Sequence, residues 1–341
     1  MTRANSILLK TLAPVAIGLA VVAWLFAREF DIDDFRRINW TLPTALGIAA
    51  AWIFMVGREA GLAWRFRVLS DRRLSWRQSI KVTMLCEFTS AITPTTAGGS
   101  ALSMVFMQRE GIAVGHATAL TMCTLLLDEA FFVIACPLIF LIVSPSELFA
   151  FDTGALATGL RTAFWIVYAL IVAITAVLFA GLIIRPGVVS AAIRRIFKLP
   201  LLRRWQNKGD ETADSMLTAS REIRTRPWKW WAEASAATFL SWTSRYLVVN
   251  ALFIAFAPAA SQLLVFARQF VVWTLLTVSP TPGGSGVSEW LFTTYYGDLL
   301  PDPSVALVIA IMWRIITYYV YLITGACMIP SWIRRGLAHK R

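Results

Sequence analysis

Apolar runs long enough to cross a lipid bilayer recur along this chain and constrain its fold more than any other feature. A transmembrane helix needs about 20 consecutive, mostly apolar residues. Hydrophobic residues make up 57% of the chain and charged residues only 15%, whereas a soluble domain carries about 25% charged residues. The pattern predicts an all-α integral membrane protein. We expect spans at about residues 7–27, 41–64, 113–143, 162–184, 230–256 and 304–330.

Positive charge is concentrated in a few loops of this chain, whose formal net charge is +12. Basic residues cluster at 65–81, at 185–229 and in the C-terminal tail, while the loops at 28–40, 144–161 and 297–303 are acidic or nearly neutral. The positive-inside rule then predicts a multi-pass protein of the bacterial inner membrane with both termini in the cytoplasm. Anionic lipids of the inner leaflet, and not nucleic acid, are the expected partner of these charges.

The segment 185–229 is predicted to be a basic cytoplasmic linker between two halves of the chain. Its stretch AAIRRIFKLPLLRRW places apolar residues between basic ones, which favours a segment lying along the inner membrane surface. A solvated loop is the alternative interpretation.

Two apolar segments, 80–111 and 262–297, are interrupted at their centres by proline and glycine. Their arms are mostly too short to cross a membrane, so we expect two broken, re-entrant helical hairpins, the first open to the cytoplasm and the second to the outside. Non-helical backbone at membrane depth persists only where protein or a water-filled cavity covers it. The predicted helix-break and gating residues are Pro94, Gly98, Gly99, Pro280, Pro282, Gly283 and Gly284.

The two interrupted segments also resemble each other. ITPTTAGGSAL at 92–102 aligns with VSPTPGGSGV at 278–287 after one gap, which pairs Gly99 with Gly284. The same offset brings the span at 41–64 close to the one at 230–256. We therefore predict two inverted-topology repeats, as in alternating-access transporters, although chance similarity between two Pro/Gly breaks is the alternative. Residues 1–184 form the first half, with span 162–184 beginning the second repeat, and 230–341 form the remainder.

Ionisable side chains at membrane depth are costly and usually face a cavity or a partner. The expected substrate-binding residues are Glu87, Asp128, Glu129, Arg268, Ser285, Glu289 and Arg314, and Arg245 is a further buried candidate. The repeat offset relates Glu129 to Arg314, so we expect these two to pair near the bilayer centre, either as a switchable contact or as a structural ion pair. Glu289 also fits a helix-start carboxylate. Arg58 and Glu59 are expected to reach an end of their span.

Enzymatic readings find little support in this sequence. GGSG at 283–286 matches a serine-protease pattern, but the only histidines are His116 and His339, neither suitably placed to activate the serine. No Walker A or zinc-protease motif occurs, and the four cysteines lie in apolar stretches. We predict no enzymatic activity, no metal and no cofactor.

The segment SPTPGGSGVSE after ARQF, its partner ITPTTAGGS, and WR at 313–314 resemble the flippase-like transmembrane domain of lysylphosphatidylglycerol synthases. The resemblance covers about residues 5–330 and implies a stand-alone member without the aminoacyl-transferase domain. It implies movement of a polar-headed lipid between leaflets. By motif it carries over Pro280, Pro282, Gly283, Gly284 and Glu289, with Arg268 and Arg314 as charged partners.

The predicted function is a flippase or scramblase for a polar-headed phospho- or glycolipid, which passes through a charged cavity between the hairpins. One alternative is a membrane scaffold or regulatory subunit of a lipid-modifying enzyme. Another is a small-solute transporter, whose cavity would be closed to lipid. A homo-oligomer is compatible with the sequence.

Overall fold

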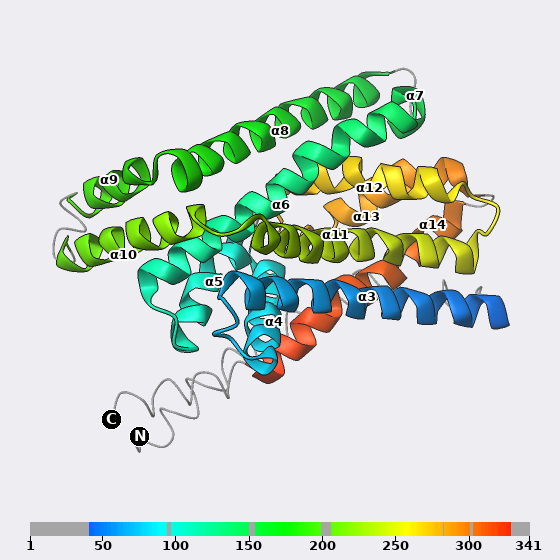
Figure 1. Cartoon of the computed structure of the whole chain (residues 1–341). Coiled ribbons are helices and arrows are strands. Elements are labelled where there is room, and N and C mark those ends of the chain that lie inside the picture. The colour runs from blue at the N-terminus through cyan, green and yellow to red at the C-terminus, as the bar shows by residue number, and fades with distance from the viewer. Residues whose placement is uncertain are drawn as a thin grey trace, which may run out of the picture.

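The structure is a computed structural model, and it describes residues 41–93, 97–149, 154–198, 206–281, 283–300 and 303–328 (Figure 1). The predicted span at 7–27 and the break residues Pro94 and Pro282 lie outside this part. The described residues form helices and no strands. In chain order these are α3 (Leu42–Leu69), α4 (Trp76–Ile92), α5 (Ala97–Arg109), α6 (Val114–Ile142), α7 (Pro145–Leu148), α8 (Ala155–Phe179), η1 (Ala180–Ile184), α9 (Pro186–Phe197), α10 (Gln206–Arg224), α11 (Trp228–Phe256), α12 (Gln262–Leu276), α13 (Val287–Tyr296), η3 (Gly297–Leu299), α14 (Pro303–Arg314) and η4 (Ile315–Tyr319).

Five helices of the described part are long and apolar enough to cross a membrane. They span Leu42–Leu69, Val114–Ile142, Ala155–Ile184, Trp228–Phe256 and Val305–Met328. These confirm five of the six predicted spans. The span predicted at 162–184 begins earlier, at residue 155. The last span combines α14, the π-helical turn η4 and a helical continuation to Met328.

Helices α3 and α11 lie side by side along much of their length (Figure 1). Small residues permit the close approach. A Cβ atom at Gly61 would lie 2.8 Å from the Ala237 carbonyl oxygen, and one at Gly47 would lie 2.6 Å from the Ala255 Cβ. In a membrane, no hydrophobic driving force pulls helices together, because lipid tails are as apolar as the side chains. Helices associate there through close van der Waals packing, which small residues such as glycine permit. The α3–α11 pair therefore forms a rigid frame against which the shorter helices pack.

The loops at residues 70–75, 110–113 and 225–227 gather at one end of the bundle, which we call the basic end because Arg72, Arg73 and Arg226 lie there. Arg226 forms an ion pair with Asp71, and the Trp230 indole N–H donates to the Val68 carbonyl at 3.1 Å. Helices α4 and α5 pack together, and the outer ends of both lie here, since Lys81 in α4 pairs with Glu110 just after α5.

The opposite end of the bundle holds the outer ends of α12 and α13, together with α7. Arg268 in α12 donates from Nε to the Glu147 carbonyl at 2.9 Å and from Nη2 to Asp298 Oδ2 at 2.8 Å. The inner ends of the two short helix pairs meet inside the molecule. There the Gly283 N–H points at the Thr93 carbonyl at 3.4 Å, and the Tyr318 hydroxyl donates to the Ala91 carbonyl at 3.2 Å.

The segment between the halves is helical where the structure describes it. Helices α9 and α10 pack on each other, with Arg194 Nη1 3.3 Å from Asp210 Oδ1. Helix α10 also packs on α6, because a Cβ at Gly115 would lie 2.3 Å from the Ser215 Cβ. The solvated-loop interpretation of this segment is therefore wrong for residues 186–197 and 206–224. Its contact with the membrane surface stays a prediction.

Candidate functional site

The break between α12 and α13 is built by glycines with positive φ angles. Gly283, Gly284 and Gly286 have φ values of 56°, 74° and 80°. L-residues with a Cβ rarely adopt this region, so the turn depends on glycine. At Gly283 the space is closed as well, since a Cβ would lie 2.1 Å from Tyr318 Cε2 and 2.9 Å from the Ala91 carbonyl oxygen. The two helix pairs thus approach each other through this glycine.

Glu289 closes the first turn of α13. Its Oε2 accepts hydrogen bonds from the Gly286 N–H at 2.7 Å and from the Ser288 hydroxyl at 3.0 Å. A carboxylate here satisfies free amides and interacts favourably with the helix dipole. The interpretation of Glu289 as a helix-start carboxylate is confirmed. The other carboxylate oxygen, Oε1, lies 2.7 Å from Arg314 Nε, so the same side chain also forms an ion pair.

Arg314 is the central cation of the break. It donates from Nη1 to the Gly283 carbonyl and from Nη2 to the Ser285 hydroxyl, each at 2.9 Å. Its guanidinium lies 3.7 Å from the centre of the Tyr318 ring. The expected Glu129–Arg314 pair is therefore wrong, because the guanidinium is occupied by the neighbouring helix pair. The π-helical turn η4 begins directly after Arg314, and such turns are frequent at functional sites.

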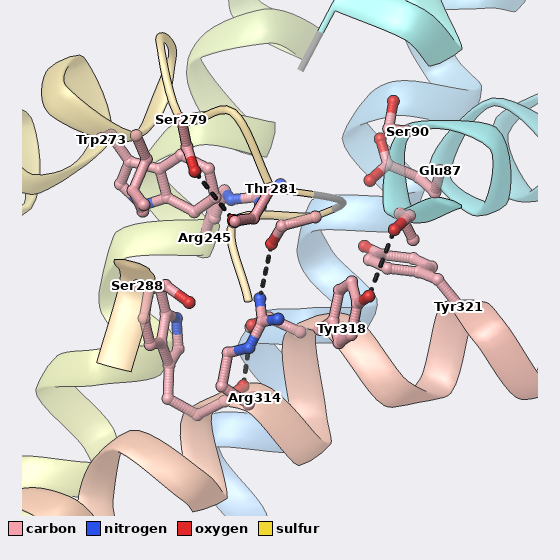
Figure 2. A pocket seen from close by; sticks show the side chains of 16 residues that line it. Glu87, Ser90, Arg245, Trp273, Ser279, Thr281, Ser288, Arg314, Tyr318 and Tyr321 are labelled. Carbon is pink, nitrogen blue, oxygen red and sulfur yellow. Dashed lines mark hydrogen bonds between the residues drawn. The ribbon is translucent and has the colours of Figure 1, made fainter. Parts of the chain in front are cut away.

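A cavity of about 70 Å³ lies where the inner ends of the two helix pairs meet (Figure 2). It is large enough for a few water molecules or a small polar group. Its charged lining comes from three elements and consists of Glu87, Arg245 and Arg314. Hydroxyl and aromatic groups make up most of the remaining lining, namely Ser90, Ser279, Thr281, Ser288, Thr317, Trp273, Trp313, Tyr318 and Tyr321.

Glu87 of α4 lines the cavity and forms an ion pair with Arg58 of α3. Arg58 Nη2 donates to Glu87 Oε2 at 2.9 Å, and Arg58 also contacts Glu59 and the Tyr321 hydroxyl. Arg58 is 5% exposed, so the expectation that it reaches an end of its span is wrong. The helix rotation that packs α3 against α4 and α11 points Arg58 inward, which residue position alone does not indicate.

Asp128 belongs to a second charged cluster that is not part of the cavity wall. Arg65 donates to both of its carboxylate oxygens, one at 3.0 Å from Nη2, and the Trp242 indole N–H donates to Oδ1 at 2.8 Å. This cluster joins α3, α6 and α11. Arg65 belongs to the basic stretch 65–81, but it is buried and paired with Asp128, so it is not a free surface charge. Its spacing of two helical turns from Arg58 on the same helix face was the available signal.

The remaining predicted residues lie outside the cavity lining. Arg268 is held at the opposite end by Asp298 and by the Glu147 and Tyr295 carbonyls. Glu129 makes no hydrogen bond or ion pair with any residue that the structure describes. Within the described residues, no three His, Cys, Asp or Glu side chains gather as metal ligands would.

In the first helix pair, Gly99 allows α5 to pack closely on α4. A Cβ there would lie 2.0 Å from the Ser90 hydroxyl oxygen and 2.2 Å from the Cys86 carbonyl oxygen in α4. Gly98 lies beside it in the same first turn, and Pro280 lies in the turn between α12 and α13.

These features define a helical membrane protein in which two interrupted helix pairs meet at a charged cavity. The family model described as the lysylphosphatidylglycerol synthase TM region matches residues 11–325. The chain belongs to this family, which confirms the resemblance seen in its sequence. It is also similar to a protein of Archaeoglobus fulgidus described as a UPF0104 membrane protein, with 25% identity over 329 residues that cover 92% of this chain and 94% of the relative. No solved structure matches the chain significantly.

Proposed function

We propose that this protein moves a polar-headed lipid between the leaflets of its membrane. The carrying observation is the cavity between the inner ends of the two helix pairs, with Glu87, Arg245 and Arg314 in its wall. Ionisable groups at membrane depth are retained at a cost and mark the paths of polar substrates. Lipid transport would account for a polar cavity placed between helices that are predominantly apolar.

The proposed architecture is a pair of inverted repeats with re-entrant hairpins. The outer ends of α4 and α5 lie at the basic end, and those of α12 and α13 at the opposite end. The proposed mates α3 and α11 pack closely on each other. A carrier of this type alternates access by moving one repeat against the other around a central site. We place the basic end in the cytoplasm, where the basic helix α9, with Arg194 and Arg195, would face anionic lipid.

The lipid's acyl chains would stay outside the protein while the headgroup crosses. Exposed apolar residues adjoin the cavity wall on both helix pairs, since Ile92 follows the lining residue Ala91 and Val278 precedes the lining residue Ser279. This placement supports a lateral opening towards lipid, which a small-solute carrier does not need.

The Glu289–Arg314 pair is the proposed switch, in place of the pair expected from the sequence. Breaking a buried ion pair without replacing the lost partner costs about 3–5 kcal/mol. A charged headgroup supplies a replacement partner and lowers this cost. Since Arg314 also holds the Gly283 carbonyl and the Ser285 hydroxyl, its release would free the break between α12 and α13.

A leaflet-exposure assay in proteoliposomes tests this function. Fluorescent lipids with zwitterionic, anionic, aminoacylated and glycosyl headgroups are quenched from outside, and the protein-dependent loss of the protected fraction is measured. Glu289→Gln and Arg314→Gln should slow this loss at least tenfold. Glu147→Gln is the matched control, because that carboxylate is exposed on α7. Absence of lipid movement in wild-type protein of native mobility on size exclusion would contradict the proposal and favour a scaffold role.

A further inference from the structure

The charged groups of the cavity are not balanced against one another. Glu87 is paired with Arg58, and Arg314 is paired with Glu289. Arg245 forms no ion pair or hydrogen bond with any residue that the structure describes. Among the described residues, the cavity lining therefore includes one guanidinium, that of Arg245, whose charge no carboxylate directly contacts.

The position of Arg245 is built by aromatic rings. Its guanidinium carbon lies 3.8 Å from the centre of the Trp273 ring and 5.8 Å from that of Trp242, and Figure 2 shows it beside Trp273. Its Nε is buried and has no hydrogen-bond acceptor in the part of the chain that the structure describes. Stacking on tryptophan orients a guanidinium and recovers part of its lost hydration, but it leaves the N–H donors unused.

Other donors in the cavity wall also lack acceptors. The indole N–H groups of Trp273 and Trp313 have no hydrogen-bond partner in the described part of the chain. Buried donors are rarely left unpaired, because each costs free energy. An excess of donors beside an unpaired cation suits a ligand that carries negative charge and only accepts hydrogen bonds.

We propose that Arg245 binds an oxyanion of the transported headgroup, namely its phosphate. This rests on the proposed lipid transport and deepens it, since it selects phospholipids over phosphate-free glycolipids. A guanidinium fork matches two phosphate oxygens at once. Arg314 already contacts Gly283, Ser285 and Glu289, so it acts as the proposed switch. Arg245 acts as the residue that binds the phosphate, which we call the receptor.

Binding by the detergent-solubilised full-length protein tests this assignment. The probes are dioctanoyl phosphatidylglycerol, a dioctanoyl glucosyl glycerol without phosphate, and free glycerol 3-phosphate. A hydrogen-bonded charge pair corresponds to roughly a tenfold to hundredfold change in affinity. Arg245→Gln should weaken phosphatidylglycerol binding at least tenfold and leave the glucosyl lipid unchanged. Arg161→Gln, on α8 outside the cavity lining, is the control.

The comparison of probes also decides where the oxyanion comes from. Binding of phosphatidylglycerol but not of glycerol 3-phosphate assigns the site to a lipid headgroup, whereas equal binding of both assigns it to phosphate in general. Arg245→Lys keeps the charge but loses the fork, so it should bind phosphatidylglycerol with intermediate affinity, and it serves if Arg245→Gln fails to fold.

The inference would be overturned if Arg245→Gln bound phosphatidylglycerol with wild-type affinity, or if it lost affinity for the glucosyl lipid to the same extent. It would also be overturned if the wild type bound neither phosphatidylglycerol nor glycerol 3-phosphate. The leaflet assay separates the two proposals. Lipid movement unaffected by Arg245→Gln refutes the receptor alone, while Arg245-dependent binding without any lipid movement refutes transport alone.

Discussion

Replacing Gly283 by alanine probes the contact between the two helix pairs most directly. The new Cβ would lie 2.1 Å from Tyr318 Cε2 and 2.9 Å from the Ala91 carbonyl oxygen, at a residue whose φ is 56°. The left-handed conformation costs an L-residue roughly 1–2 kcal/mol. Overpacking adds about 1–3 kcal/mol, so the total loss of stability is about 2–5 kcal/mol.

Gly286→Ala is the control for a positive φ angle, because an alanine there meets no collision. Its φ is 80°, and no atom of the described residues beyond its own neighbours lies within 4 Å of the Cβ position. The free energy of unfolding is measured for both variants by reversible unfolding in mixed micelles, followed by tryptophan fluorescence. We expect Gly283→Ala to be less stable than Gly286→Ala by about 1–3 kcal/mol. Equal destabilisation of the two variants would refute the close approach of α12–α13 to α4 and Tyr318.

Three further perturbations follow from the same contacts. A double-mutant cycle on Glu289→Gln and Arg314→Gln should give a coupling free energy of about 1–3 kcal/mol in unfolding experiments, and additive effects would contradict the ion pair. Gly61→Leu should destabilise the α3–α11 interface by more than about 2 kcal/mol, whereas Gly159→Leu, with open space around it, should change the unfolding free energy by less than about 0.5 kcal/mol. Arg268→Gln should lower the unfolding free energy by about 3 kcal/mol but leave the headgroup selectivity in the leaflet assay unchanged, since this side chain joins α12 to the opposite end and does not line the cavity.

The spans and the break in the second helix pair could be predicted because they depend on short stretches of sequence. A run of apolar residues determines a membrane helix wherever it stands, and SPTPGGSG cannot continue one. The glycines at 283 and 284 were predicted as break residues, and their positive φ angles agree with that role. The similarity between the two broken segments also pointed to their meeting inside the molecule.

The partners of the buried charges could not be predicted in the same way. Arg314 pairs with Glu289 instead of Glu129. The reason is that the end of α14 packs against the 283–286 turn, which places the Arg314 guanidinium beside Glu289. The predicted repeat offset proposes which residues are symmetry mates, but it does not say how each helix is rotated. Arg268 shows the same limit, because its partner Asp298 lies 30 residues further along the chain, in the short helical turn η3.

The amino-acid sequence by itself determined that the chain spans a membrane, where its helices break and which family it belongs to, because hydropathy, proline, glycine and motif spacing act locally. Only the tertiary structure decided that Glu87 and Arg314 are paired, while Arg245 stacks on Trp273 and has no ion-pair partner among the residues the structure describes. That distinction depends on distances of a few ångströms between helices far apart in the sequence. Packing of small residues and the rotation of each helix set those distances.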